Sequence, residues 1–261
     1  MSCITPTYLS ELNHHPRDEY IKFYEEDHKY TVYGEGGYTS VTTLVHQNFE
    51  HFDADAIIDK MMSSKKFLES THKYFGMTKQ DIKDMWANNG KQASEAGTQT
   101  HFNIECFYNN IEVNDDSIEF QYFKNFVKDY PDLKAYRTEW TVWDQDLKIS
   151  GSIDMVFENP DGTLSIYDWK RVKEIQYENN FGKYAITDCL KHLPDTNCSH
   201  YSIQLNLYKY ILEKKYKKKI SSLVLVILHP NNKNYELVEV LDLQKEVQEL
   251  LGVHKHNLST I

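Results

Sequence analysis

The chain has 261 residues, of which 40% are hydrophobic and 26% are charged, and its formal net charge is -10 at pH 7. This is an ordinary globular composition, and the chain is long enough to bury a sizeable hydrophobic core. The acidic balance argues against a protein that coats nucleic acid through a broadly basic surface, so any contact with nucleic acid must be local.

Neither a membrane span nor a signal peptide is expected. No run of eighteen apolar residues occurs, and the first twenty residues lack a basic stretch followed by an apolar one. We therefore expect an intracellular protein, in the cytoplasm, the nucleus or an organelle of the host cell, that is not secreted and has no membrane partner. Four scattered cysteines without a CxxC pair are typical of reduced thiols rather than of a disulfide framework or a zinc site: Cys3, Cys106, Cys189 and Cys198.

The first half of the chain is expected to be mainly helical after a short hairpin. Between residues 28 and 45, β-prone residues alternate around Gly34 to Gly37 and lead to serine and threonine residues, which predicts a small β-hairpin followed by a capped segment. Apolar residues then recur at spacings of three and four, and this pattern predicts helices within residues 52–70, 77–110 and 115–131.

The second half changes to a period of two, which indicates strands. A three-stranded meander is predicted, with the turn Asn159 to Gly162 joining its last two strands, over residues 136–144, 147–158 and 163–170. The chain is then expected to continue with a helix, an apolar strand of the kind buried on both faces, a hairpin-like segment and a short helix over residues 200–216, 221–230, 234–243 and 244–251.

The order of these elements predicts an α/β (α+β) protein with a central mixed β-sheet flanked by helices. No repeat, low-complexity segment or linker rich in proline, glycine and serine interrupts them. We expect one structural domain, with residues 81–261 as the core and residues 1–80 as an N-terminal hairpin and helical elaboration packed on it.

Two carboxylates and a lysine lie on the last two strands of the predicted meander. Asp154 precedes the turn and Asp168 and Lys170 follow it, so a tight hairpin can bring both carboxylates to one end of the sheet. Mg²⁺ and Mn²⁺ prefer oxygen ligands, commonly one or two carboxylates completed by water and substrate phosphate. A lysine beside them can orient the attacking water, as metal-assisted phosphodiester hydrolysis requires. The alternative is a solvated ion pair between Asp168 and Lys170, which share one face of their strand.

Two further residues could face the same pocket. His101 lies on a predicted helix, and the small residue Gly97 one turn earlier would let that helix approach the sheet closely. Glu139 lies on the strand before Asp154. Each also has a plainer explanation, since a lone helical histidine is usually a packed or surface residue and a strand glutamate is often exposed.

Four short motifs follow one another along the chain: GTQTH (97–101), GSID (151–154), DWK (168–170) and QLNLY (204–208). In these motifs and their order the chain resembles the RecB-type branch of the PD-(D/E)XK nuclease superfamily. The segments before the core are similar to those of viral and mitochondrial genome-maintenance exonucleases of this branch. The resemblance covers about residues 86–208 and implies a restriction-endonuclease-like core.

The resemblance implies a metal site and a catalytic lysine. His101, Asp154 and Asp168 would bind one or two Mg²⁺ or Mn²⁺ ions, together with the backbone carbonyl of Trp169. Lys170 would be the catalytic lysine.

Three more residues are placed near this site by the resemblance. Glu139 would be a further ligand or an orienting acid. Gln204 and Tyr208 are four residues apart and share a helix face, and in the family such a pair lies beside the active site. Ordinary packing of Tyr208 is the alternative.

The chain departs from the family pattern in three ways. Ile153 precedes Asp154 where the name of the superfamily promises proline, although this branch commonly lacks that proline. Arg171 follows the motif lysine where many relatives have threonine or serine, which leaves the local phosphate contacts open. No cysteine follows Tyr208, so the iron-sulfur cluster of some relatives is not expected here.

The resemblance implies a Mg²⁺- or Mn²⁺-dependent deoxyribonuclease. We expect an exonuclease that acts on single-stranded DNA or on DNA with free ends, in viral or organellar replication, recombination or repair. Two other functions remain open: an RNA endonuclease of the cap-snatching type, and a non-catalytic nucleic-acid- or protein-binding module on the nuclease fold. A serine or cysteine nucleophile is poorly supported, because the chain has no GxSxG motif and no cysteine with a recognisable activating neighbour.

Two stretches outside the motifs could contact nucleic acid. Six lysines between residues 209 and 219 form either a solvated helix end or a track for phosphates. Aromatic and basic residues are interleaved after the DWK motif, a pattern that allows stacking on unpaired bases, although packing is the commoner role of a tyrosine: Lys173, Tyr177, Phe181, Lys183 and Tyr184.

Overall fold

The computed structural model describes residues 5–24, 27, 29–179 and 181–260. The chain forms two compact units, one made of residues 1–50 and 100–261 and the other of residues 51–99. Helix α4 (Lys79–Tyr108) belongs partly to each unit, and a core beginning at residue 81 stays a prediction. None of the helices in the described part of the chain combines the length and apolarity needed to cross a membrane.

Within the described residues, the larger unit carries a six-stranded mixed sheet. Its strands are β3 (Thr39–Ser40), β4 (Lys134–Asp144), β5 (Ile149–Glu158), β6 (Leu164–Lys170), β7 (Ile220–Ile227) and β8 (Glu236–Glu239). The pairs β4–β5, β5–β6 and β7–β8 are antiparallel, whereas β3–β5 and β6–β7 are parallel. The predicted meander and the predicted mixed sheet are confirmed.

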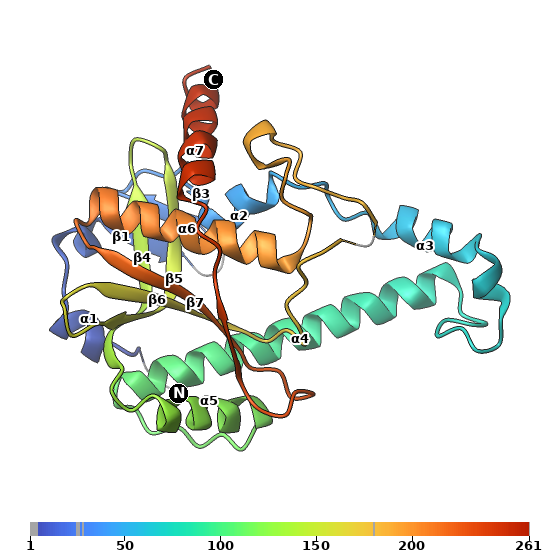
Figure 1. The fold of residues 1–261 in the computed structure, drawn as a ribbon, viewed down its shortest axis with the longest axis horizontal. Coiled ribbons are helices and arrows are strands. Elements are labelled where there is room, and N and C mark those ends of the chain that lie inside the picture. Colours follow the sequence, from blue (N-terminus) through green and yellow to red (C-terminus); the bar gives the residue numbers. More distant parts are fainter. Residues whose placement is uncertain (1–4, 25–26, 28, 180, 261) are drawn as a thin grey trace. The chain divides into compact units, whose positions relative to one another are not determined.

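Helices cover both faces of this sheet (Figure 1). The main helices and 3-10 helices of the unit, besides the end of α4, are α1 (Tyr8–Leu12), η1 (Pro16–Tyr20), α2 (Val41–His46), α5 (Ile118–Asp129), η3 (Asp188–Leu190), α6 (Asn197–Lys215) and α7 (Gln244–Leu258). Residues of α2, α6 and α7 share one hydrophobic core with the sheet, and residues of α5 and the end of α4 share another. Alternate side chains of β6 point to opposite faces of the sheet, so Leu164 and Ile166 belong to the first core and Trp169 to the second.

One edge of β5 is divided between two partners. Along its other edge, β5 pairs with β4 from Ile149 to Glu158. On the divided edge, β3 pairs with Ile149 and Ser150, and β6 pairs with residues 155–158. Among the described strands, none pairs with residues 151–154 on that side. Asp154 of the GSID motif therefore lies where two neighbouring strands separate.

Local sequence signals set the ends of several elements. Gly162 adopts a φ of 78° in the turn between β5 and β6, a left-handed conformation that favours glycine. The side chain of Ser40 accepts a hydrogen bond from the amide of Thr43 and caps α2, as the sequence predicts. Strand β7 contributes Leu225 to one core and Val226 to the other, so its continuous apolar run is explained by burial on both faces.

The N-terminal hairpin uses a different partner strand from the one expected. Strand β2 (Lys29–Val32) pairs with β1 (Ile21–Tyr24), which precedes it, and Val32 lies opposite Ile21. Beyond the glycine-rich turn, the chain does not return along β2 but enters the main sheet as β3. Pairing Val32 with Ile21 places two buried side chains on one face, and this burial fixes the register.

Arg17 and Asp18 bind their segment to β4 through charged and aromatic contacts. The Arg137 guanidinium lies 2.6 Å from the Asp18 carboxylate, and the Trp140 indole donates a hydrogen bond of 2.9 Å to the same carboxylate. The guanidinium of Arg17 lies 3.5 Å from the ring centroid of Trp143. This segment is therefore part of the larger unit.

The smaller unit is helical. It contains α3 (Ala54–Met62), the 3-10 helix η2 (Lys65–Leu68) and residues 79–99 of α4. Its small core consists of Ile58, Phe67 and Ile82 with partly buried aromatic and methionine side chains around them. The helices expected within residues 52–70 and 77–110 are confirmed, although the first is shorter than its sequence window.

Candidate active site

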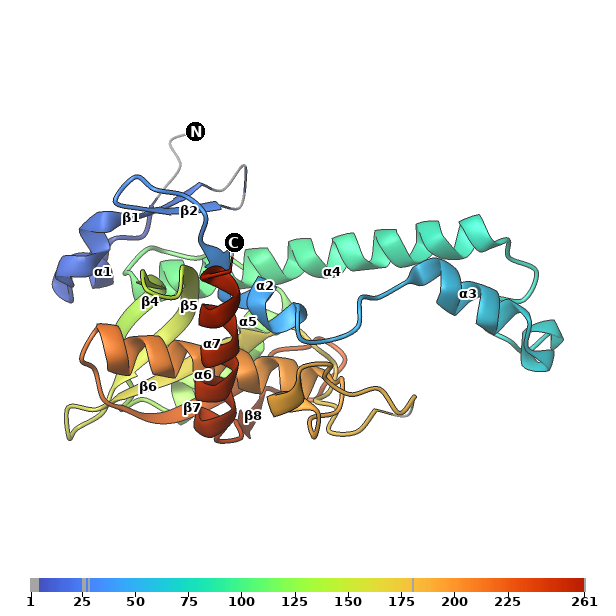
Figure 2. The same ribbon diagram turned by 90° about the horizontal axis from the view of Figure 1, so that it is seen from above.

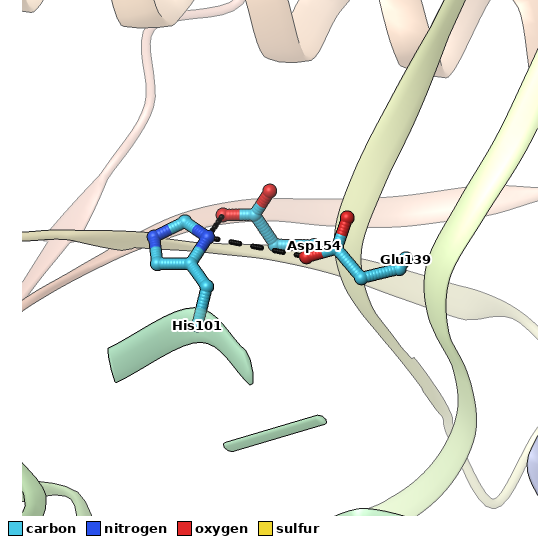
Figure 3. A group of neighbouring side chains, drawn as sticks. All are labelled: His101, Glu139 and Asp154. Carbon is cyan, nitrogen blue, oxygen red and sulfur yellow. Dashed lines mark ion pairs between the residues drawn. The ribbon is translucent and has the colours of Figure 1, made fainter. Parts of the chain in front are cut away.

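His101 is held in one orientation by the backbone of the DWK motif. Its Nε2 lies 2.9 Å from the carbonyl oxygen of Trp169. Since a carbonyl only accepts, Nε2 carries the hydrogen and Nδ1 of the neutral ring has a free lone pair. This Nδ1 lies 3.5 Å from Oδ2 of Asp154 and 3.9 Å from Oε1 of Glu139 (Figure 3). The helix thus presents a nitrogen ligand to two carboxylates.

Asp154 lies on the divided edge of β5. Its Oδ2 accepts a hydrogen bond of 3.0 Å from the backbone amide of Trp169. The ladder between β5 and β6 ends at Met155 and Tyr167, so the side chain of Asp154 replaces the next backbone acceptor. Trp169 consequently holds two site residues, His101 through its carbonyl and Asp154 through its amide.

Glu139 faces Asp154 across the β4–β5 pair. Their neighbours Thr138 and Met155 lie opposite each other, which places Glu139 opposite Asp154. The backbone of Glu139 has a φ of 41°. Residues other than glycine rarely adopt this left-handed conformation, which costs about 1 to 3 kcal/mol of folding free energy. Ser152 donates a hydrogen bond of 2.8 Å to its Oε2. Burial and the nearby charge of Asp154 raise the pKa of Glu139 to about 8.

Asp168 and Lys170 form a buried ion pair. Nζ of Lys170 lies 2.6 Å from Oδ2 of Asp168 and 4.6 Å from the ring centroid of Tyr201 on α6. Burial, followed by the charge of Asp154, raises the pKa of Asp168 to about 6. Burial by itself lowers the pKa of Lys170, but the two aspartates outweigh it and leave that pKa above its ordinary value. A solvated ion pair at an exposed strand edge does not describe these residues, because Asp168 is only 2% exposed.

The predicted pair on α6 lies against the same region of β5. The side chains of Gln204 and Tyr208 are hydrogen-bonded, and burial raises the pKa of Tyr208 above its ordinary value. A Cβ added at Gly151 would lie 2.8 Å from the Tyr208 hydroxyl, so only glycine leaves room for this ring. Tyr208 is therefore a packed side chain that also lies beside the site, because the charges of Asp154 and Asp168 help raise its pKa.

Three neighbours of the site receive no role from the sequence. Tyr201 precedes Gln204 by one helical turn, and that spacing of three is the signal that could have identified it. Glu105 follows His101 by one turn, and burial raises its pKa to about 7. Tyr30 of β2 is close enough to Glu139 for that charge, after burial, to help raise its pKa to about 12. No sequence signal points to Tyr30.

The donor set fits a divalent cation. One ligand atom each from His101, Glu139 and Asp154 can be chosen so that all lie within 4.8 Å of one another. Carboxylate oxygens bind divalent cations such as Mg²⁺ and Mn²⁺, and an imidazole nitrogen is a common ligand of transition-metal ions. The structure brings the predicted site residues into one region, but Asp168 is engaged by Lys170 and the carbonyl of Trp169 by His101.

Residues beside the motifs have partners of other kinds. Arg171 pairs with Glu119 of α5 at 2.6 Å, so its guanidinium is engaged within the protein. Lys183 pairs with Glu50, while Tyr177, Phe181 and Tyr184 are exposed. Cys3 lies outside the described residues, and the other three cysteines are free thiols.

The lysine-rich stretch lies at the end of α6, which finishes at Lys215. Lys215 pairs with Asp144 and Asp146, and Lys218 donates a hydrogen bond to the Tyr136 hydroxyl. These partners favour a charged helix end over a continuous track for phosphates.

One comparison with known proteins identifies a family. The family model of the PD-(D/E)XK nuclease superfamily matches residues 41–258. No curated protein matched the sequence. Among solved structures, a candidate exonuclease from Eubacterium rectale is 13% identical with a TM-score of 0.30, and the match covers 58% of this chain and 69% of that one. A protein named SSO0001 is 15% identical with a TM-score of 0.26, covering 54% of this chain and 58% of its own.

Proposed function

The chain belongs to the PD-(D/E)XK nuclease superfamily, and from this premise we propose that it is a divalent-metal-dependent deoxyribonuclease. The family supports a nuclease, that is, a phosphodiester hydrolase. The observation that carries the proposal is the convergence of His101, Glu139 and Asp154 within reach of one cation, next to the Asp168–Lys170 pair. An intact set of ligands beside a buried lysine argues against a binding module that has lost its catalytic residues.

The metal site of this proposal uses His101 through Nδ1 and Asp154 and Glu139 through carboxylate oxygens. We propose Asp168 as a further ligand. The Trp169 carbonyl is proposed to orient His101 by accepting its hydrogen bond and is also a candidate ligand. One or two Mg²⁺ or Mn²⁺ ions bound there would polarise the scissile phosphodiester and stabilise the charge that develops during in-line displacement.

Lys170 is the proposed catalytic lysine, and we propose no metal-binding role for it. Its ammonium would donate hydrogen bonds to the attacking water and to a non-bridging phosphate oxygen, and so align the two for attack. Asp168 fixes the ammonium from one side and the ring of Tyr201 lies on another. Gln204 and Tyr208 would keep α6 in register with β5 beside the reacting phosphate.

DNA is the proposed substrate, single-stranded or with free ends, and exonucleolytic cleavage in viral or organellar replication, recombination or repair is the proposed role. This choice is supported by the resemblance of the GTxxH and QxxxY motifs to the DNA-processing branch of the family. Cap-snatching cleavage of RNA uses a similar histidine, acid and lysine site and is the alternative. We propose an intracellular setting, where such a substrate is found.

Cleavage of matched substrates tests this proposal. The full chain is incubated with Mg²⁺ or Mn²⁺ and with end-labelled single-stranded DNA, blunt and tailed duplexes, circular DNA and RNA of the same sequence. We expect cleavage of linear DNA that EDTA abolishes, and loss of at least about 100-fold in rate for Lys170→Ala and Asp168→Ala. Lys245→Ala, at an exposed position on α7, serves as the control. Cleavage of RNA but not DNA would favour the alternative, and unchanged cleavage by both variants would refute the site.

A further inference from the structure

The connection between α3 and α4 concentrates positive charge in an acidic protein. This α3–α4 connection, residues 63–78, contains Lys65, Lys66 and Lys73 against a single acidic residue, Glu69. Its formal net charge is therefore +2, whereas the whole chain has a formal net charge of -10. All three lysines and the glutamate are exposed.

Two lysines at the start of α4 are neutralised by carboxylates of α3, and the lysines of the connection are not. Lys79 of α4 lies 3.1 Å from Asp55 and 2.7 Å from Asp59, and Lys83 lies 2.8 Å from Asp55. In the part of the chain that the structure describes, none of the three lysines of the α3–α4 connection forms an ion pair. Their charge is thus available to an external anion.

The same connection exposes apolar side chains next to residues that are packed in the small core. Leu68 is 74% exposed and Phe75 is 52% exposed. Their neighbours face inward: Phe67 is 8% exposed in the small core, and the Tyr74 hydroxyl accepts a hydrogen bond of 3.0 Å from the Trp86 indole. The exposed ring of Phe75 therefore follows a residue that is anchored to α4. Figure 2 shows the connection running from the end of α3 to the start of α4.

We propose that the α3–α4 connection is a binding surface for single-stranded nucleic acid, with Lys65, Lys66 and Lys73 against phosphates and Phe75 stacked on an unpaired base. This inference rests on the proposed nuclease function, because a nuclease must hold a polyanionic strand. Charge complementarity selects the partner, since a chain of this acidity can attract a polyanion only through local clusters of unpaired cations. The exposed ring selects unpaired bases, since the bases of a duplex already stack on one another.

Equilibrium binding of the full chain to labelled oligo(dT) and to a duplex of equal length tests the surface. Binding is measured in EDTA, so that no cleavage occurs, at several salt concentrations. For the triple variant Lys65→Gln, Lys66→Gln, Lys73→Gln we expect affinity for oligo(dT) at least about 10-fold weaker, and a slope of log K against log salt about 2 smaller in magnitude. For Phe75→Ala we expect a loss of about 5-fold or more with oligo(dT) and little change with the duplex.

A matched control separates local contacts from net charge. The triple variant Lys128→Gln, Lys214→Gln, Lys245→Gln removes the same charge from exposed positions of the larger unit. We expect it to bind oligo(dT) as the unmodified chain does. Thermal melting of each variant shows whether the fold persists, and Leu68→Ala provides a second uncharged variant of the same surface.

The outcomes distinguish this inference from the proposed catalysis. Loss of binding in the variants of the α3–α4 connection, with bis(p-nitrophenyl) phosphate hydrolysed at the normal rate, supports both. Specific loss of binding with no hydrolysis by any form of the chain supports the surface and refutes the proposed activity. Oligo(dT) binding with an unchanged salt slope in the variants overturns the surface, as does binding of phosphatidylserine vesicles in place of oligo(dT).

Discussion

The carbonyl oxygen of Trp169 lies 2.9 Å from Nε2 of His101 and leaves Nδ1 facing the carboxylates. This relationship predicts that His101 contributes a ligand whose loss weakens cation binding. We expect His101→Ala to lower the affinity for Mn²⁺ by about 10-fold or more in isothermal titration calorimetry.

His254 offers a matched control for this experiment, because its Nε2 also lies 2.9 Å from a backbone carbonyl, that of Leu147. His254→Ala removes the same kind of contact from α7 and should leave Mn²⁺ affinity unchanged. Equal losses in both variants would show that His101 acts only through the fold.

Tyr201 is expected to position Lys170 through the face of its ring. A cation over an aromatic ring in a partly buried site is stabilised by about 1 to 2 kcal/mol. Tyr201→Leu should therefore lower kcat for DNA cleavage by about 10-fold. The ring stabilises the ammonium form, so its removal lowers the pKa of Lys170 and should move the alkaline limb of the pH-rate profile to lower pH.

Tyr201→Phe keeps the ring and is the conservative control. It should retain kcat and the position of the alkaline limb. If the leucine variant changes only KM, or if both variants behave alike, then the ring does not act on Lys170.

The stability of the cation-free protein should fall as the pH rises. The pKa of Glu139 is raised to about 8 and that of Asp168 to about 6, so the folded chain binds more protons than the unfolded chain above the ordinary carboxyl pKa. Stability then decreases as pH rises through these folded-state values. Thermal melting between about pH 5 and about pH 8.5 in EDTA measures this decrease.

Mg²⁺ should reverse this trend, because carboxylates bind the cation only when they are deprotonated. We expect added Mg²⁺ to raise Tm more at about pH 8.5 than at about pH 6. Glu139→Gln removes the group with the higher pKa and should flatten the upper part of the curve in EDTA. A Tm that rises with pH in EDTA would contradict the assignment of these raised pKa values.

Gly151 is expected to tolerate no side chain. The added methyl of Gly151→Ala would meet the Tyr208 ring and hydroxyl at 2.9 and 2.8 Å, and overpacking of this kind costs about 1 to 3 kcal/mol. Urea unfolding should show this loss, together with reduced cleavage as Tyr208 is displaced.

Gly252 in α7 supplies the opposite case, since a Cβ there has no neighbour within 4 Å. Gly252→Ala should leave activity unchanged and stabilise the helix by up to about 1 kcal/mol. A neutral result at Gly151 would mean that Tyr208 can move without consequence.

Sequence periodicity was sufficient for the strands from β4 onward and for the main covering helices, because burial imposes a period of two on strands such as β6 and of three to four on helices such as α5. It also indicated that Asp154 and Asp168 would meet, since a four-residue turn leaves little freedom to the strands it joins. In the structure Asp168 lies 2.6 Å from Nζ of Lys170, and the charge of Asp154 helps raise the pKa of this lysine.

Other features left no trace that periodicity could reveal. The contacts of Trp169 with His101 and Asp154 are made by backbone groups, which every residue carries. The division of the chain at residues 99 and 100 falls inside one continuous helix, so composition does not change there. The sequence suggests that β2 pairs with the strand after it, because the glycine-rich turn after β2 resembles a hairpin turn. In the structure β2 pairs with the preceding strand β1, and Val32 lies opposite Ile21.

The divided edge of β5 makes β3 an integral part of the sheet that bears the site. Strand β3 supplies only Thr39 and Ser40, yet these two residues terminate the hydrogen-bonding edge at Ile149 and Ser150. A truncated chain that begins after them would carry unpaired backbone groups at this point, which is the condition under which sheets recruit foreign strands and aggregate. A chain shortened to the segment that contains the family motifs would therefore lose β3, which pairs with the strand that bears Asp154.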